Sequence, residues 1–302
     1  MKIRKNNLAI FTTPKITVYL IHDMPSGLTN KVILVTGASG GIGSAAALAF
    51  NQAGAKVAIT SRRKEKLDQL ARQMKDPLVV PADLSSPEQS VDTIRQVIEH
   101  FGRIDVLVNN AASIIVTTAD TVTPADLLQA FSTNLIAPVV ATQEAILHMR
   151  RQGGGHIINI GSPGFMMGIP FYAPYVCSKA AFSAWTRTIQ AEWSGTGIRI
   201  SEYFPGYVST DSKPESRIGE VEQDFLMEKK QNFITKKFTH PKTPDDVARD
   251  LIHLILKPKL LMYSDLSVRI GTFIANFPKI RLSIASQMAK TARAKRNLMP
   301  HS

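Results

Sequence analysis

The sequence of 302 residues has little cysteine, no long hydrophobic run and no charge bias over its central part. Its single cysteine, Cys177, excludes an intrachain disulfide and favours a reducing compartment, and we interpret its side chain as a small buried filler. No terminal stretch reaches the ~18 apolar residues needed to cross a bilayer. Pro14 and Lys15 interrupt the first apolar stretch too early for a signal peptide. A cytoplasmic protein is therefore expected.

The formal net charge of +12 is concentrated at the two ends of the chain. Residues 1–31 contain five Lys/Arg and one acid, and residues 257–302 contain nine Lys/Arg and one acid. The segment between them has equal numbers of basic and acidic side chains, so it has no bias toward polyanions. This balance argues against a nucleic-acid-binding core. We expect no nucleic-acid partner, and we predict no metal site.

From residue 31 onwards, short β-rich runs alternate with stretches of helical length. The strands are expected at 31–36, 56–60, 77–82, 105–111, 156–162 and 198–204, and the helices at 44–53, 64–75, 87–101, 124–151 and 175–195. Near-continuous Val/Ile strands that alternate with helices are typical of a parallel sheet covered on both faces. We therefore predict an α/β, doubly wound Rossmann-type sandwich of three layers over residues 28–256. Such sheets bind ligands beyond the carboxyl ends of their strands.

Three segments fall outside this alternation. Residues 1–27 are expected to be an N-terminal extension, and the charged insertion at 211–242 is either a mobile lid or a pair of solvated surface helices. Residues 257–302 form a basic C-terminal extension with a proline at 278 that should kink or divide a helix. Its apolar side chains fall near one helical face, at Leu266, Ile270, Phe273, Ile274, Phe277, Ile284 and Met288. Such a helix lies in an anionic membrane interface, packs over the substrate pocket or contacts a partner subunit; all three remain open.

The first expected strand leads directly into TGASGGIG (36–43) and then into a helix. Gly37, Gly41 and Gly43 permit a tight turn, a close approach of the backbone to a ligand and close helix packing. The helix N-terminus offers unpaired N–H groups to a pyrophosphate. The segment, which includes Ser39 and Ile42, is therefore predicted to bind a dinucleotide.

The choice between NAD and NADP is predicted from the sequence after the second expected strand. A site that prefers NAD has an acid there against the ribose 2′-hydroxyl, whereas this chain has Ser61, Arg62 and Arg63 in TSRRK (60–64). Guanidinium groups bind a 2′-phosphate well, and no carboxylate is available to repel it. We predict NADP(H), with Arg62 as the main contact. The alternative is that Arg63 and its neighbour only decorate an exposed helix start.

The sequence YVCSK (175–179) has a tyrosine and a lysine four residues apart. On a helix these positions lie on the same face, so the phenol of Tyr175 and the ammonium of Lys179 are expected close together. A neighbouring cation favours the ionised phenol and lowers its pKa. The same spacing occurs by chance in many helices, so it needs support from the rest of the chain.

Several separated motifs, in order, carry a resemblance to a known family. They are TGASGGIG (36–43), ADL (82–84), NNAA (109–112), the asparagine of STNLIAP (132–138), NIGS (159–162), YVCSK (175–179) and PGYVST (205–210). Over residues 28–256 the chain resembles the short-chain dehydrogenase/reductase family in its single-domain form.

The resemblance implies a catalytic set of four residues. Tyr175 matches the general acid/base, and Lys179 matches the lysine that lowers the pKa of the phenol and binds the nicotinamide ribose. Ser162 corresponds to the serine that holds the substrate oxygen, and Asn134 to the asparagine that bends a helix and holds a water in the proton path. These roles suit hydride transfer to a carbonyl, because the developing oxyanion needs a proton and a hydrogen bond.

The resemblance also implies further cofactor contacts. Those around the adenosine are Asp83, Leu84, Asn110 and Ala111, and those around the carboxamide are Pro205, Gly206, Val208 and Thr210. Each has a purely structural alternative: Asp83 caps the next turn, Asn110 ties strands together, and Thr210 starts a helix. The chain departs from the family at Ala112, where a glycine is usual, and at Pro163, which directly follows the serine.

The segment between serine and tyrosine, GFMMGIPFY (164–172), suggests the kind of substrate. Its apolar side chains are predicted to line the substrate pocket, at Phe165, Met166, Met167, Ile169 and Phe171. We therefore predict an oxidoreductase for a small lipophilic ketone, aldehyde or secondary alcohol, and expect a homodimer or homotetramer. The alternatives are a 3-oxoacyl reductase that acts on carrier-bound chains and a non-catalytic dinucleotide-binding redox sensor.

Overall fold

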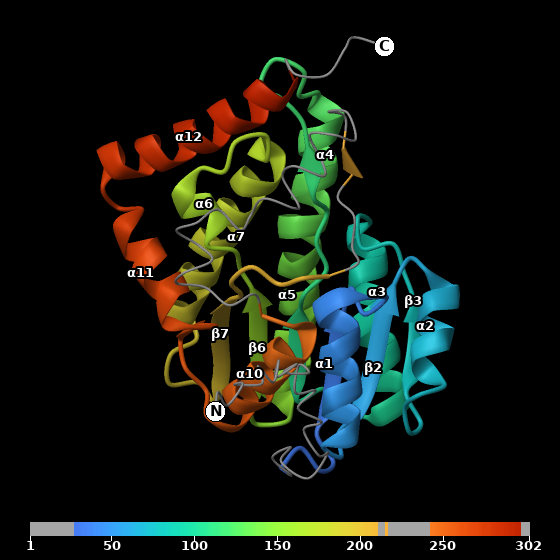
Figure 1. Cartoon of the computed structure of the whole chain (residues 1–302). Coiled ribbons are helices and arrows are strands. Elements are labelled where there is room, and N and C mark those ends of the chain that lie inside the picture. The colour runs from blue at the N-terminus through green and yellow to red at the C-terminus, as the bar shows by residue number, and fades with distance from the viewer. Residues whose placement is uncertain (1–26, 211–214, 217–241, 297–302) are drawn as a thin grey trace, which may run out of the picture.

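The computed structural model describes residues 27–210, 215–216 and 242–296, and its main feature is one parallel sheet of seven strands (Figure 1). The strand order is β3-β2-β1-β4-β6-β7-β9. The strands are β1 (Val32–Thr36), β2 (Lys56–Ser61), β3 (Leu78–Pro81), β4 (Val106–Asn109), β6 (Gly155–Ile160), β7 (Ile198–Phe204) and β9 (Leu261–Tyr263). The predicted doubly wound fold and its six strands are confirmed.

Helices cover both faces of the sheet, as the buried Val/Ile-rich strands require. One face packs against α1 (Gly41–Gln52), α2 (Lys64–Ala71) and α10 (Pro244–Leu256). The other packs against α3 (Pro87–Phe101), α5 (Ala137–Arg151) and α7 (Ala173–Glu192). The two apolar cores meet the sheet from opposite sides and make it rigid, so the loops at its edge have a fixed base.

Local sequence explains where several helices begin. Thr123 forms a capping box with Asp126 at the start of α4 (Pro124–Phe131), and Thr243 does the same with Asp246 at the start of α10. Ser86 caps α3 by accepting a hydrogen bond from the Gln89 N–H. In all three helices a proline follows the cap, at the position where a missing N–H does no harm.

The segment expected as one helix over 124–151 is divided. A turn of π-helix, η2 (Ser132–Ile136), lies between α4 and α5. Such turns widen the backbone and recur at functional sites. Here the turn contains Asn134, the residue for which the family resemblance implied a bend.

Two further expectations need correction. The strand β9 lies inside the segment 257–302 that was expected to be an extension. It is only three residues long, and it forms because these residues pair with the edge of β7. Cys177 is exposed and not a buried filler, because the side of α7 that carries it faces away from the core.

Beyond β9 the chain forms two helices, α11 (Leu266–Ile274) and α12 (Pro278–Arg296). Pro278 begins the second helix, which confirms the predicted division. The expected N-terminal extension lies outside the described residues. So does most of the expected lid at 211–242, of which β8 (Glu215–Ser216) pairs with β5 (Ile115–Val116).

Candidate active site

The residues with predicted roles gather at the carboxyl edge of the sheet. All the strand pairs of the main sheet are parallel, so segments that follow them emerge on one side. The loop 36–43 follows β1, residues 110–111 follow β4, Ser162 follows β6 and residues 205–210 follow β7. The two chemical residues Tyr175 and Lys179 lie on α7, which packs beside β7.

The glycine loop is closed too tightly for any other residue at two positions. A Cβ on Gly37, whose φ is +69°, would lie 2.7 Å from the Ala111 Cα. A Cβ on Gly43 would lie 2.4 Å from the Gly37 carbonyl oxygen and 2.6 Å from Asn110 Nδ2. These contacts require glycine and hold the loop against the end of β4.

The first turn of α1 begins at Gly41 without a side-chain cap. Its unpaired N–H groups and the positive end of the helix dipole therefore remain available to an anion. Ile42 is half-buried and packs onto the core, so it anchors this turn from below. The loop and the helix end together fit the pyrophosphate of a dinucleotide.

Arg63 lies across this loop. Its guanidinium donates to Ser39 Oγ at 2.9 Å and 3.2 Å and to the Ser39 carbonyl oxygen at 3.3 Å. Ser61 Oγ accepts from the Arg63 N–H at 3.3 Å. The guanidinium that contacts the loop is thus that of Arg63, the residue to which the sequence assigned the smaller role.

Arg62 points to a different neighbour. Its charge helps to lower the pKa of Asp83, although the main cause is a hydrogen bond from the Ser85 N–H. Asp83 Oδ1 accepts from the Ser85 N–H at 3.0 Å and from its hydroxyl at 2.9 Å, so the aspartate caps the next turn. The neighbouring Leu84 is buried. The structural alternative for Asp83 is therefore present.

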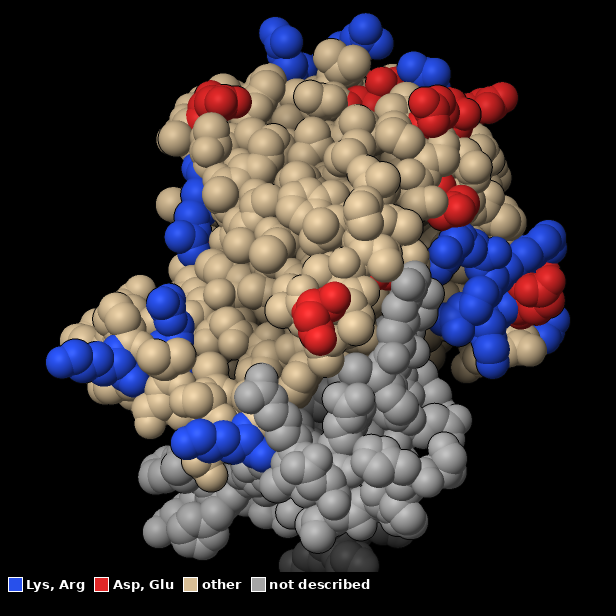
Figure 2. Space-filling model, turned by 90° about the horizontal axis from the view of Figure 1, so that it is seen from above, with Lys and Arg blue, Asp and Glu red and all other residues tan. Residues whose placement is uncertain are grey.

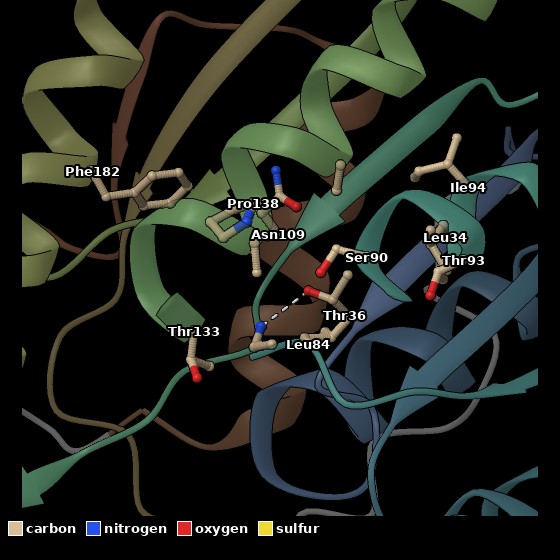
Figure 3. A pocket seen from close by; sticks show the side chains of 13 residues that line it. Leu34, Thr36, Leu84, Ser90, Thr93, Ile94, Asn109, Thr133, Pro138 and Phe182 are labelled. Carbon is tan, nitrogen blue, oxygen red and sulfur yellow. Dashed lines mark hydrogen bonds between the residues drawn. The ribbon is translucent and has the colours of Figure 1, made fainter. Parts of the chain in front are cut away.

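Asn110 ties the end of β4 to the end of β1. Its side-chain amide donates to the Thr36 carbonyl oxygen at 2.8 Å, and its N–H donates to Thr36 Oγ1 at 2.9 Å. The Ala111 N–H donates to the same hydroxyl at 3.0 Å, the bond drawn in Figure 3. These bonds fix the floor of the cofactor groove, as the structural alternative for Asn110 predicted.

The cavity in Figure 3 lies beneath this floor. It is lined mainly by apolar and small side chains, among them Thr36, Leu84, Ser90 and Pro138. The space that the centre of a water molecule can occupy in it is about 10 Å³, so the cavity accommodates at most one water molecule. We therefore assign it to imperfect packing under the groove, because a nucleotide is far too large for it.

The Ser162 side chain lies close enough to the Tyr175 phenol to affect its pKa. Burial raises the pKa of Tyr175, and Ser162 partly lowers it. Ser162 is itself buried, and its Oγ accepts from the Gly164 N–H at 3.2 Å. The structure thus brings together the two hydroxyl groups that the sequence paired, thirteen residues apart.

Lys179 does not act on the phenol as the sequence suggested. Burial lowers the pKa of Lys179 to about 8, and the nearby Glu202 carboxyl raises it in part. The Lys179 Nζ donates to the Ile160 carbonyl oxygen at 2.8 Å, and its side chain is 3% exposed. The expected fall in the pKa of Tyr175 is therefore wrong for this structure, since burial of the phenol outweighs a lysine bound to the backbone of β6.

Asn134 is buried and held on both sides of its amide. Its Oδ1 accepts from the Ser113 N–H at 2.7 Å, and its Nδ2 donates to the Ser113 carbonyl at 2.9 Å and to Ser178 Oγ at 2.9 Å. Ser178 Oγ donates in turn to the Tyr175 carbonyl at 2.9 Å. The π-turn is thus connected to the helix that carries the tyrosine.

The segment after β7 is joined to the C-terminal part of the chain. The Gly206 N–H donates to Ser264 Oγ at 2.9 Å, and Val208 forms an isolated bridge with Lys242. Pro205 and Thr210 are half-buried at the two ends of this segment. These four predicted residues therefore lie together in one segment at the carboxyl end of β7.

An apolar wall lies beside the phenol. Ile169 and Phe171 pack in one cluster with Tyr172 and Tyr175, while Phe165 contacts Phe204 edge-on at 6.0 Å. Met166 and Met167 are half-buried in the short helix α6 (Gly164–Met167). Phe171 has φ of +70°, which is strained for an aromatic residue, and its carbonyl accepts from the Thr117 N–H at 2.9 Å. A left-handed backbone at an aromatic residue persists only where the surrounding structure holds it in place, here by the hydrogen bond from Thr117.

Sequence reasoning missed three residues that support the site. Ser113 holds Asn134, and Ser264 holds Gly206; both lie in loops without a recognisable motif. Glu202 is 1% exposed, its Oε1 has no hydrogen-bond partner, and its Oε2 lies 3.7 Å from Arg187 Nε. Burial raises the pKa of Glu202, against smaller opposite effects of Ser183, Arg187 and Lys179. A carboxylate in the middle of the apolar strand IRISEYF was a visible signal for it.

Several known proteins are similar to this chain in sequence or structure. A ketoacyl reductase (HetN) of Nostoc is 36% identical over 186 residues, which cover 60% of this chain and 65% of its own. A rat protein named dehydrogenase/reductase SDR family member 7B is 27% identical and covers 89% of this chain and 85% of its own.

A solved structure from Beutenbergia cavernae is described as a putative NAD(P)-dependent gluconate 5-dehydrogenase with bound NADP at low occupancy. It superposes with a TM-score of 0.69 and 27% identity, and the match covers 80% of this chain and 97% of that one. The model of the short chain dehydrogenase family matches residues 31–220. Together with the glycine loop and the Ser162, Tyr175 and Lys179 cluster, this shows that the chain belongs to the short-chain dehydrogenase/reductase family of NAD(P)-dependent oxidoreductases.

Proposed function

We propose that this protein is an NADP(H)-dependent reductase or dehydrogenase of small lipophilic carbonyls and secondary alcohols. The observation that carries the proposal is the proximity of Tyr175, Ser162 and Lys179 at the edge where the glycine loop lies. Bound nicotinamide supplies the hydride in this chemistry.

The side chains contribute the proton and the orientation. In the reducing direction the Tyr175 phenol donates its proton to the substrate oxygen, while the Ser162 hydroxyl hydrogen-bonds the same oxygen as negative charge develops. The phenol holds its proton at neutral pH, as a general acid must, and burial, which raises its pKa, makes it a weaker donor than a free phenol. Lys179, held by the Ile160 carbonyl oxygen, is assigned the other role that the family resemblance implies, to bind the nicotinamide ribose.

Two features of the groove support the choice of NADP(H) and of a lipophilic substrate. Ser39 and Arg63 form a polar, cationic corner beside the loop, with Ser61 behind them and Arg62 near Asp83. This corner suits the 2′-phosphate of NADP. The apolar wall around Phe171 favours hydrocarbon over a charged metabolite.

A second candidate is reduction of 3-oxoacyl chains bound to a carrier. The 36% identity to a protein named ketoacyl reductase favours it. The chemistry at the carbonyl is the same in both cases, and only the group beyond the acyl chain differs. A homodimer or homotetramer remains part of the proposal, and the exposed Leu128, Ile136 and Leu147 on the α4–α5 side support it.

The test is a substrate panel assayed with NADPH and with NADH. It contains lipophilic ketones and aldehydes, a 3-oxoacyl thioester and a small charged ketone. We expect turnover of the lipophilic carbonyls with NADPH, and Tyr175→Phe to lower it by about 10²–10⁴-fold because the proton donor is lost. Tyr263→Phe, a tyrosine of β9 outside the cluster, is the matched control and should retain activity. Full activity of Tyr175→Phe, or turnover of the charged ketone alone, would contradict the proposal.

A further inference from the structure

The helices α11 and α12 expose an unusual number of large apolar side chains. Of the fourteen such side chains among the described residues, seven lie between 266 and 284, with exposed fractions of 39–69%. They are Leu266, Ile270, Phe273, Phe277, Ile280, Leu282 and Ile284. Single exposed apolar residues are normal on any surface, but a contiguous group marks an interaction site.

In α11 these side chains form one stripe. Leu266, Ile270 and Phe273 are spaced by four and three residues, so they lie on one side of the helix, and the Phe273 ring contacts that of Phe277 at 5.7 Å. The opposite side is buried through Thr272 and Ala275. The helix is therefore fixed to the protein by its inner side and exposes its apolar side to solvent.

The charged residues of α11 and α12 themselves are all basic. Arg269, Lys279 and Arg281 are exposed next to it, and no Asp or Glu occurs anywhere after Asp265. Figure 2 looks down on the end of the molecule that carries α12 and shows a broad surface of mainly uncharged side chains, with Lys and Arg along its left edge and Asp and Glu groups at the upper edge and near the lower centre. An apolar stripe flanked by basic residues is complementary to an anionic lipid surface.

The position of these helices connects them with the groove. The Asp265 side chain caps α11 by accepting from the Val268 N–H at 3.0 Å, and the adjoining Ser264 binds the N–H of Gly206. A Cβ on Gly206 would lie 2.9 Å from the Val268 side chain, so the first turn of α11 packs directly on the segment that follows β7. In Figure 1, α12 crosses above α6 at the carboxyl edge of the sheet.

We propose that the outer side of α11 and the first turns of α12, residues 266–284, dock in the interface of an anionic lipid bilayer. Docking is peripheral: among the described residues, no helix combines the length and apolarity needed to cross a membrane. A second copy of the chain suits this face less well. A two-fold interface over this face would gather Arg269, Lys279 and Arg281 of both copies in one contact area, to which residues 266–302 contribute no acid.

The docking surface goes beyond the proposed reaction and does not depend on it. If that reaction also holds, the groove with its apolar wall lies beside the lipid phase, and a lipophilic substrate can reach it without crossing water. Binding to lipid and turnover are measured separately, so either can fail alone.

The test is flotation of the full-length protein with vesicles. One set contains phosphatidylcholine alone, and the other contains phosphatidylcholine mixed with phosphatidylglycerol. We expect binding to the anionic vesicles, weakening as salt rises because the charges are screened. Phe273→Ser combined with Phe277→Ser should lower the partition coefficient at least about tenfold, since interfacial binding scales with inserted apolar area.

Two further variants complete the design. Leu260→Ser is the control. Leu260 directly precedes β9, away from α11, and is as exposed as Phe273 (66% against 65%), so this variant should bind vesicles as the wild type does. Arg269→Gln, Lys279→Gln and Arg281→Gln together should abolish the preference for anionic vesicles. Absence of binding by the wild type, or equal binding by the Phe273/Phe277 variant, overturns the proposal. Light scattering is the last test. A dimer in the wild type that becomes a monomer in the Phe273/Phe277 variant would show that this face binds a second copy, and would also overturn the proposal.

Discussion

Lys179 is expected to make the stability of this protein rise with pH between 7 and 10. Burial lowers its pKa from 10.5 to about 8, so the folded state loses the proton before the unfolded state does. Where the unfolded state binds more protons, stability rises with pH. The penalty for the buried charge is fully present below pH 8 and is gone above pH 10.5. A shift of about 2.5 pKa units corresponds to about 3 kcal/mol, of which about 2–3 kcal/mol fall between pH 7 and pH 10.

The substitution that isolates this effect is Lys179→Met, which keeps an unbranched apolar side chain and removes the titrating Nζ, which lies 5.5 Å from the centre of the Phe182 ring. Other residues titrate in both proteins, so their contributions cancel in the difference. The hydrogen bond to Ile160 is also lost, but a neutral amine still donates it, so its loss is largely independent of pH.

The assay is urea denaturation of both proteins at several pH values from 7 to 10. We expect the wild type to gain about 2–3 kcal/mol relative to Lys179→Met over this range. Lys56→Met, the same substitution at an exposed lysine of β2, serves as the control and should follow the wild type. Parallel pH profiles for wild type and Lys179→Met would show that the ammonium is not desolvated, and the reasoning would fail.

Three further predictions concern the glycine loop, the phosphate corner and Glu202. Gly43→Ala should destabilise the protein by about 1–3 kcal/mol and abolish nucleotide binding, because its Cβ would lie 2.4 Å from a backbone oxygen. Gly271→Ala is the control: its added Cβ would meet no neighbouring atom within 4 Å, so it should stabilise α11 by up to about 1 kcal/mol. Calorimetry compares the thermal stability of the two variants. A Gly43→Ala variant as stable as the wild type would refute the loop geometry. Arg63→Ala should raise the KM for NADPH about tenfold or more relative to the KM for NADH, and Arg62→Ala should raise it less. An unchanged ratio of the two KM values in both variants would show that these arginines do not bind the 2′-phosphate. Glu202→Gln removes the charge that raises the pKa of Lys179, so the stability gain should begin at lower pH; an unmoved profile would show that the two groups are not coupled.

Much of the site was predictable because its parts are local in sequence. The glycine loop, the strand-helix alternation and the four-residue spacing of Tyr175 and Lys179 each depend on backbone geometry that a few neighbouring residues decide. The parallel sheet then brings the loops after β1, β4, β6 and β7 to one edge, so the meeting of distant motifs followed from the fold class alone.

Side-chain partners across the fold were less predictable. Which guanidinium reaches Ser39 depends on the direction in which β2 ends, and that favours Arg63 over Arg62. The pKa values of Tyr175 and Lys179 depend on how fully other elements bury them, which no spacing along one helix reveals. The strand β9 was missed because three residues carry no period of their own, and only the unpaired edge of β7 makes them a strand.

The sequence alone determined the Rossmann-type fold and the glycine loop, because local propensity and motif spacing specify them, and its resemblance to the family implied the four candidate catalytic residues. Only the tertiary structure decided which groups are desolvated, which arginine lies on the loop, and that the apolar stripe of α11 stays exposed beside the groove. Those properties arise from the packing of segments far apart in the chain, where burial and charge act together.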